Sequence, residues 1–265
     1  HEDSGNFLIS SAQVDKDIIF KGNDGGGVIE AMRIDMSSGG NVGIGTAAPS
    51  FPLSVQSNSN AEGLLILGRS SDDIGEIAFR ENDNSTALGE LQYRQDHAIL
   101  RHRVGDLRFA TGGTTERMRI DANGAVTMPA QPAFLARPSV GQTNLPNGVT
   151  TVIFDTEIFD QNSDFASNTF TAPVAGKYHL DANLWLEQVD TAINYLYLRL
   201  LTSNRNYNHI ISPRFSSDPT YWNFQCSVLA DMDAGDTASV LYSQSGTSAQ
   251  VDIGDKSFFS GYLVA

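Results

Sequence analysis

One segment of the sequence, Gly176 to Glu187, constrains the fold more than any other. Apolar residues occupy every second position in it, and polar residues fill almost all the positions between them. The apolar row is Tyr178, Leu180, Ala182, Leu184 and Leu186. Strict alternation over this length predicts a β-strand with one buried face, because successive side chains of a strand point to opposite sides.

Composition extends the β prediction to the whole chain and excludes several classes of protein. The 265 residues are 40% hydrophobic and include 24 Gly, and no helical period runs beyond about ten residues. The net charge of −14 leaves no basic face for nucleic acid. Neither a transmembrane segment nor a signal peptide is visible, so we expect no membrane insertion. The only cysteine, Cys226, cannot form an intrachain disulfide, and it alternates with apolar residues as a core residue does.

The first half of the chain is repetitive. A short pattern of acid, aliphatic, variable and aromatic residues begins at Asp17, Glu76, Glu90 and Asp106. A second repeat relates residues 30–35 (EAMRID) to residues 116–121 (ERMRID), and a Gly-containing turn and another short apolar run follow each copy. Such strands carry too few apolar residues to fold alone, and they need neighbours in their own or in identical chains. We therefore predict a repetitive β shaft over residues 1–128.

The second half predicts a compact head. Pro129, Pro132 and Pro138 mark a stiff neck, which places the head at residues 129–265. About ten strands are expected in the head. The predicted strands lie near 133–137, 149–154, 159, 169–172, 176–187, 192–202, 207–213, 221–232, 236–245 and 256–264. This number fits a jelly roll of two sheets.

The head resembles the globular domains of the C1q and tumour-necrosis-factor families. The residues that carry the resemblance are Phe154, Asp160, Phe165, Phe170, Gly176, Tyr178, Phe259, Gly261 and Tyr262. Leu180 stands where these families usually have Phe, and the similarity covers roughly residues 133–265. It implies a ten-stranded C1q/TNF-like jelly roll that assembles as a trimer.

Residues 41–49 (NVGIGTAAP) are similar to a segment common in the shafts of bacteriophage tail fibres and spikes and in some bacterial surface proteins. Such shafts are parallel, intertwined trimers of short strands. Together with the head, this resemblance implies a homotrimeric appendage with a repetitive shaft and a C1q-like tip.

Two sets of residues are candidates for contacts with partners. Large aromatic residues on strands that are apolar on both faces predict a trimer interface, because a sandwich strand needs only one apolar face. These residues are Trp185, Tyr195, Tyr197 and Trp222. The second set lies on the loops 187–192, 214–220 and 246–255, which alternation of strand direction places at the apex, away from the neck. Its members are Asp190, Thr191, Asp218, Thr220, Gln250 and Asp252, with Glu187 and Arg214 on the same loops.

Other motifs carry weaker functional signals. Asp24–Gly27 and Gly43–Gly45 lack phosphate-loop spacing and are expected to be turn glycines. Asp231, Asp233 and Asp236 lack the spacing of a calcium loop. His97 and His102 have no zinc-site partners in sequence, and they are expected on the surface. We expect no cofactor, with a calcium ion at the apex or on the three-fold axis as the one alternative.

These observations favour a structural and binding protein rather than an enzyme. We expect the distal part of a phage tail fibre or similar virion appendage, attached to upstream virion proteins, whose tip binds a host-surface glycan or protein. The chain starts at His1 without Met, and we expect it to be a piece of a longer protein. Two alternatives stay open: a tailspike-like glycan depolymerase with paired carboxylates, and an adhesin on a bacterial cell surface.

Overall fold

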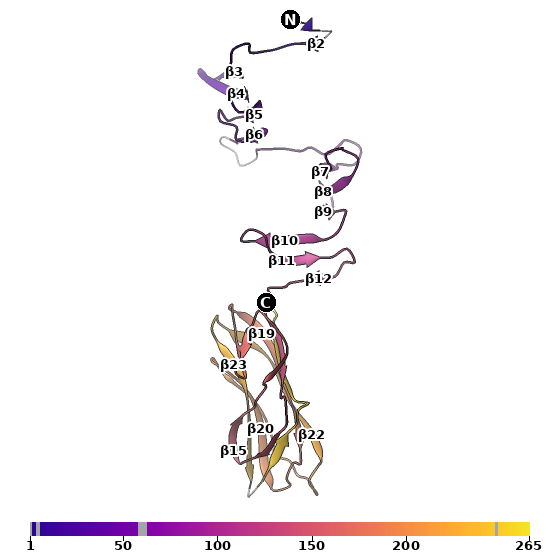
Figure 1. Cartoon of the computed structure of the whole chain (residues 1–265), viewed down its shortest axis with the longest axis vertical. Helices are drawn as coiled ribbons and strands as arrows, with labels where there is room; N and C mark the ends of the chain where they lie inside the picture. The colour runs from indigo at the N-terminus through magenta and orange to yellow at the C-terminus, as the bar shows by residue number, and fades with distance from the viewer. Residues whose placement is uncertain (1, 4–5, 58–62, 247–248) are drawn as a thin grey trace. The chain divides into compact units, whose positions relative to one another are not determined.

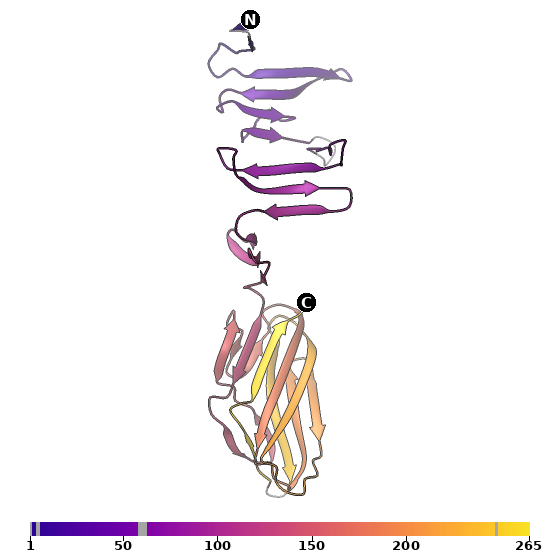
Figure 2. The same ribbon diagram turned by 90° about the vertical axis from the view of Figure 1, so that its right-hand side faces the viewer.

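The computed structural model describes residues 2–3, 6–57, 63–246 and 249–265, and it confirms the all-β prediction. Those ranges contain 25 strands and no helix (Figures 1 and 2). Contacts divide the chain into two compact units, residues 1–104 and 105–265. The boundary predicted at 128/129 differs from this division and stays a prediction. Among the described strands, no pairing joins a strand before Met128 to one after Pro129.

The first 127 residues form a two-stranded ribbon and three small sheets. The ribbon pairs β1 (Glu2–Asp3) with β2 (Asn6–Phe7). The first sheet consists of β3 (Ile18–Asp24), β4 (Gly27–Asp35), β5 (Asn41–Ile44) and β6 (Leu53–Val55). The second consists of β7 (Gly75–Arg80), β8 (Ala87–Tyr93) and β9 (Ala98–His102). The third consists of β10 (Leu107–Thr111), β11 (Thr115–Ile120) and β12 (Val126–Thr127).

The sequence repeats correspond to repeated backbone geometry. Each of the three sheets opens with an antiparallel hairpin whose register shifts directly after the aromatic residue of the repeat, which is Phe20, Phe79 or Phe109. In the first and third sheets the two MRI tripeptides also occupy the same place. Ile34 pairs with Ile18 and Val42, and Ile120 pairs with Leu107 and Val126. One structural module therefore recurs in the chain.

The predicted turn glycines divide into two kinds. Asp24–Gly27 closes the β3–β4 hairpin, and Gly25 and Gly26 have φ angles of 59° and 94°, as a tight two-residue hairpin turn requires. Gly43 is instead inside β5, so the expectation of a turn is wrong for Gly43, whereas Gly45 follows the strand in a bend with a φ of 71°. A Cβ on Gly43 would lie 2.5 Å from the carbonyl oxygen of Thr46, and close approach of the backbone explains the glycine.

The second half is a jelly roll of two facing sheets. One sheet has the pairing order β14 (Gln142–Leu145), β24 (Val251–Ile253), β19 (Gly176–Glu187), β25 (Phe258–Leu263), β13 (Ala133–Arg137) and β16 (Thr156–Gln161), with β22 (Tyr221–Met232) also on β19. The other has the order β17 (Phe165–Ala166), β18 (Thr169–Thr171), β23 (Thr237–Gly246), β20 (Ile193–Thr202) and β21 (Asn206–Ile211), with β15 (Gly148–Thr151) on β23. After β19 the chain crosses to β20 and β21, returns to β22, crosses again to β23 and ends in β24 and β25, as in a jelly roll.

The core of this domain is built on the residues that carry the C1q resemblance. The predicted apolar row of β19 is fully buried. Phe134 is the centre of an aromatic cluster, with ring centroids 4.9 Å from Phe165, 4.8 Å from Phe170 and 4.9 Å from Phe259. Tyr178 packs on Phe170 at 5.3 Å and donates its hydroxyl to the carbonyl oxygen of Val174. Large aromatic rings from both sheets therefore fill the centre of the core.

The strand count differs from the prediction of ten. The described residues of the domain form 13 strands, β13 to β25. The three that sequence reasoning missed are β14, β17 and β24. They contain 4, 2 and 3 residues, too few for an alternating pattern to emerge.

Asp164 offers a test of electrostatics in this domain. Its Oδ2 atom is buried and has no hydrogen-bond partner in the described structure, and burial, then the nearby Asp160 carboxylate, raises the pKa of Asp164. Because the folded-state pKa of Asp164 is raised, the free-energy cost of burying its charged form is absent below the ordinary aspartate pKa and is complete above the raised pKa. Asp164→Asn should therefore stabilise the protein at pH 7 by about 1 kcal/mol, with no gain near pH 3. Urea unfolding at the two pH values measures this, and equal gains at both would contradict it.

Candidate functional site

The predicted apex loops do meet at one end of the jelly roll. The amide of Gln188 donates to the carbonyl of Thr220 at 3.2 Å, and the amide of Asp190 donates to that of Gln250 at 3.3 Å. The opposite end holds the chain entry and the C terminus, since the amide of Leu263 donates to the carbonyl of Pro132 at 3.1 Å. Figure 2 shows the loops between the long strands gathered at the end away from the C terminus. Residues 247–248 of the predicted loop 246–255 lie outside the described residues.

The acidic candidates in these loops hold backbone amides. One oxygen of Asp218 accepts the amide of Thr191 at 2.7 Å, and one oxygen of Asp190 accepts the amide of Ala192 at 2.7 Å. Asp252 is on β24 rather than in a loop, and its Oδ1 accepts the amide of Asn144 at 2.6 Å. These three carboxylates therefore fix the shape of the apex. Whether they also touch a receptor remains a prediction.

A buried polar pair, Gln244 and Tyr242, lies beneath the apex loops and holds two of their segments. Gln244, 1% exposed, donates its amide nitrogen to the carbonyl oxygens of Leu145 and Ala249, at 2.6 and 3.1 Å. Its Oε1 accepts the hydroxyl of Tyr242 at 2.9 Å, and burial raises the pKa of that tyrosine. The neutral network ties two apex segments to β23, so the loops rest on a rigid base.

Between two of these loops the surface is hollowed. Residues 191–194 form one wall and residues 212–216 the other, and they enclose about 550 Å³. The rim carries hydroxyl, amide and guanidinium groups, and Ile193 and Phe215 contribute apolar surface. Phe215 is anchored by an edge-on contact with Trp222, with the ring centroids 4.3 Å apart. Sequence reasoning placed Arg214 on an apex loop but did not single out this hollow.

The four aromatic residues predicted at a trimer interface do not share one face. Trp185 lies on the outer side of the seven-stranded sheet, donates its ring nitrogen to Glu187 at 2.8 Å and has the Nζ of Lys256 5.1 Å from its ring. Tyr195 and Tyr197 lie on the outer side of the other sheet. Trp222 alternates with exposed neighbours and packs on the core of its own chain, so an outward position for it is wrong.

The outer side of the seven-stranded sheet exposes other large apolar residues that sequence reasoning missed. Tyr221, Leu229 and Tyr262 are 59%, 56% and 50% exposed. Tyr221 packs beside Trp185 at 5.2 Å, and Tyr262 lies 5.3 Å from the His179 ring. The sequence does contain a sign of this exposed face. Tyr221 and Leu229 are an odd number of residues from the buried Phe224, so along a strand they point to the opposite face. This face is suited to burial against another protein surface.

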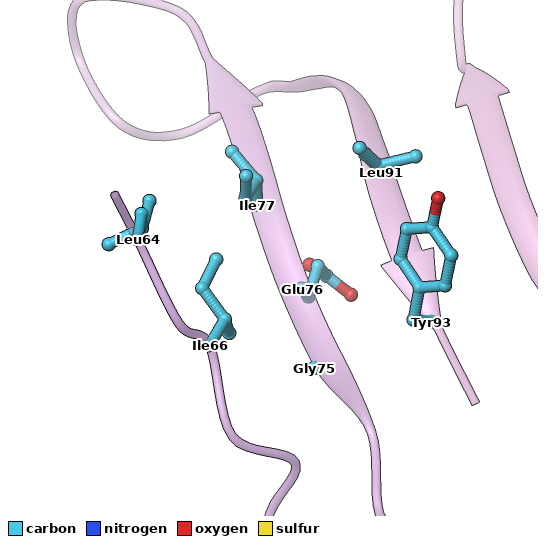
Figure 3. A pocket seen from close by; sticks show the side chains of 7 residues that line it. All are labelled: Leu64, Ile66, Gly75, Glu76, Ile77, Leu91 and Tyr93. Carbon is cyan, nitrogen blue, oxygen red and sulfur yellow. The ribbon is translucent and has the colours of Figure 1, made fainter. Parts of the chain in front are cut away.

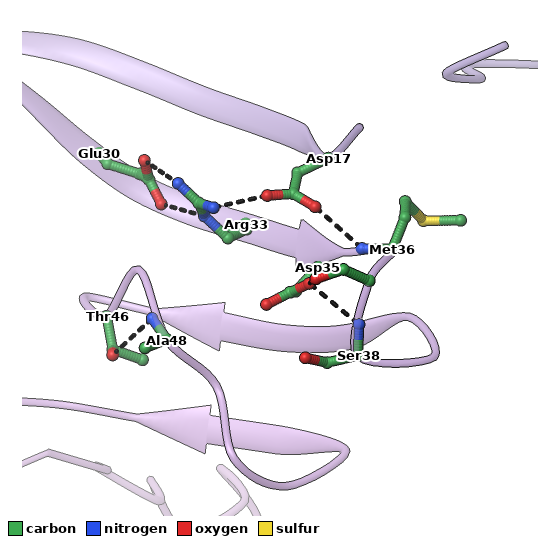
Figure 4. A network of polar contacts seen from close by, with 9 residues as sticks. Asp17, Glu30, Arg33, Asp35, Met36, Ser38, Thr46 and Ala48 are labelled. Carbon is green, nitrogen blue, oxygen red and sulfur yellow. Dashed lines mark hydrogen bonds and ion pairs between the residues drawn. The ribbon is translucent and has the colours of Figure 1, made fainter. Parts of the chain in front are cut away.

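The small sheets of the first half are apolar on one side and ion-paired on the other. In the first, Arg33 contacts Asp17 at 2.5 Å and Glu30 at 2.7 Å (Figure 4). In the third, Arg119 contacts Asp106 at 3.1 Å and Glu116 at 2.9 Å, the equivalent residues of the repeat. The Arg33–Glu30 hydrogen bond lowers the pKa of Glu30. Each module therefore fixes one face as polar.

The second sheet repeats this division with other residues. Glu90 is 3% exposed and accepts hydrogen bonds from Arg101 and Arg103. On the opposite face, Ile77 and Leu91 pair across the strands, and Leu64 and Ile66 extend the apolar surface into an open groove of about 230 Å³ (Figure 3). Leu64 and Tyr93 are well exposed there. The apolar face is left without cover by its own chain in the described residues.

No metal-binding cluster emerges in the described ranges, where no three His, Cys, Asp or Glu side chains converge. Asp231 forms an ion pair with Arg205 at 2.9 Å, and Asp236 accepts a hydrogen bond from the amide of Asp233 at 2.8 Å. These carboxylates therefore stabilise a turn at the chain-entry end. His97 contacts Asp96 at 2.7 Å on the surface. Cys226 packs against the core, as predicted, and burial raises its pKa.

Within the described part of the chain, no helix has the length and apolar character needed to cross a membrane.

Comparisons with known proteins give structural similarity without a family assignment. No family model matches the sequence, and no curated protein matches it. The globular domain of zebrafish complement 1qA protein is similar over 51% of this chain and 98% of its own, with 18% identity and a TM-score of 0.39. Murine APRIL at pH 8.0 is similar over 51% of this chain and 99% of its own, with 13% identity and a TM-score of 0.39.

Proposed function

We propose that this chain is the distal part of a homotrimeric tail fibre or similar virion appendage, with a host-binding jelly-roll tip. Residues 1–128 act as a shaft in this proposal, and the apex loops contact a host-surface receptor. The described acidic residues of the apex, Asp190, Asp218 and Asp252, accept backbone amides and so shape the loops, which supports a binding role.

One observation carries the proposal. Among the described residues from 7 to 128, no Ala, Val, Ile, Leu, Met, Phe or Tyr side chain is buried, while every buried side chain of these types lies between Phe134 and Phe259. Well-exposed apolar side chains occur throughout this part; examples are Phe20, Ile44, Phe79, Leu100, Phe109 and Val126. Small sheets with an open apolar face are not stable alone in water. Their repeated geometry favours identical chains as the missing cover.

Charge and symmetry support the same arrangement. Every module has its ion pairs on one face, so only the apolar face can enter a dry interface without burying charge. Three copies around an axis would each turn the apolar face inward and the Arg33-type and Glu90-type clusters outward. The resemblance of residues 41–49 to tail-fibre shafts supports three chains rather than two, and it supports a virion location.

The mass in solution tests the assembly. Light scattering at micromolar concentration should give about three times the single-chain mass of 28.6 kDa, since obligate interfaces of ~2,000–5,000 Å² keep subunits together at such concentrations. A mass of one chain would contradict the shaft model. Labelled protein should then bind saturably to a subset of whole bacteria in a panel, and at least about 100-fold more weakly when made monomeric, because three linked sites act together.

A further inference from the structure

The strongest unassigned feature is the hollow between residues 191–194 and 212–216. Arg214 is the single basic residue in the described parts of the four segments that meet at this end, namely 143–147, 188–192, 212–220, and 246 with 249–250. It is exposed, and it lies among Thr191, Asn194 and Ser212 at the rim. No acidic side chain forms an ion pair with Arg214 in the described part of the chain.

We propose that this hollow binds one acidic sugar residue, with Arg214 pairing to its carboxylate. The inference rests on the proposed function and names the class of receptor. Guanidinium groups bind carboxylates through two parallel hydrogen bonds, which a neutral hydroxyl cannot match in strength. The hydroxyl and amide groups of the rim suit the sugar hydroxyls.

The size and construction of the hollow fit this ligand. A volume of about 550 Å³ admits one sugar residue and part of a second. Phe215, which is half-buried, supplies apolar surface for the sugar ring, and its contact with Trp222 holds that surface in place. Asp218 fastens one wall to the other through the amide of Thr191, so the hollow has its shape before binding.

Overall charge sharpens the prediction. The chain carries a net charge of −14, which repels long polyanions at low salt. A single cation in an acidic chain therefore favours a terminal or isolated carboxylate over a highly charged polymer. Added salt should weaken binding, because the ion pair is at the surface.

Titration of the full chain with free sugars, followed by NMR, tests the assignment. The probes are glucuronic acid and N-acetylneuraminic acid, with glucose as the neutral counterpart. At least one of the two acids should bind saturably, and Arg214→Gln should weaken that binding about tenfold or more. Arg214→Lys should retain part of it. Arg205→Gln, which removes a cation at the chain-entry end that is 57% exposed, should bind like the parent.

Three results would overturn the inference: no saturable binding of either acid, equal binding of glucose, or an Arg214→Gln variant within about twofold of the parent. Cell binding measured in parallel separates this failure from failure of the proposed function. A trimer that adheres to bacteria equally well with Arg214→Gln would keep the appendage model and reject the acidic sugar, in favour of a neutral glycan or a protein receptor.

Discussion

Phe109→Asp should convert the proposed trimer into single chains, whereas Arg108→Gln should leave it intact. The two residues are adjacent on β10, so their side chains point to opposite faces of the same small sheet. Arg108 lies on the ion-paired face, 3.0 Å from Asp106, and Phe109 pairs with Met118 on the apolar face. A carboxylate at position 109 would be buried without a partner in an assembly, and such charges cost about 3–5 kcal/mol each.

Light scattering on matched samples of the two variants measures the difference. The expected masses are that of one chain for Phe109→Asp and that of three chains for Arg108→Gln. Circular dichroism should show that Phe109→Asp has lost strand signal while Trp fluorescence, which arises only from Trp185 and Trp222 in the jelly roll, is retained. An assembly that tolerates Phe109→Asp would show that the apolar faces of the small sheets do not form the interface.

Much of the jelly roll could be predicted because its long strands alternate. The row from Tyr178 to Leu186 is buried as expected, and strand direction alone placed loops 187–192 and 214–220 at a common end. These properties depend on local periodicity and on chain connectivity, both of which a sequence displays. The repeats in the first half were visible for the same reason, and each copy lies at a hairpin.

The roles of individual polar and aromatic residues could not be predicted in this way. Asp190 and Asp218 look like free loop carboxylates in sequence, yet each accepts a backbone amide. The sequence predicts Trp222 at a trimer interface because its strand is apolar on both faces, but Phe215, seven residues earlier on a loop, packs edge-on against it. Such partners are brought together by loop conformation, which has no period and leaves no pattern in the sequence.

The apolar surface of the small sheets could likewise be predicted only in part. The sequence predicted that the shaft strands could not bury their apolar residues alone, and the described structure shows them exposed. It did not indicate which face of each sheet is apolar. The register shifts after Phe20, Phe79 and Phe109 change which residues of the paired strands lie on the same face. A bulge of this kind moves later side chains to the other face of the sheet.

Phe134→Ala should destabilise the jelly roll by about 3–5 kcal/mol, the usual cost of removing a fully buried Phe ring. Its ring stacks on Phe165 and Phe170 and meets the edge of Phe259, so the truncation leaves a cavity bounded by three rigid rings from both sheets. Those rings come from short strands and from the C-terminal strand, and backbone pairing limits how far they can move to fill the space. The change should therefore lie at the upper end of the range.

Urea unfolding monitored by Trp fluorescence measures this loss, because both tryptophans belong to the jelly roll. Val140→Ala, at a loop position that is 70% exposed, should change the stability by less than about 0.5 kcal/mol and serves as the control. The expected pattern is a lower midpoint for Phe134→Ala with an unchanged denaturant dependence, since the folded domain stays compact. A loss below about 1 kcal/mol would show that the aromatic cluster is not the centre of the core.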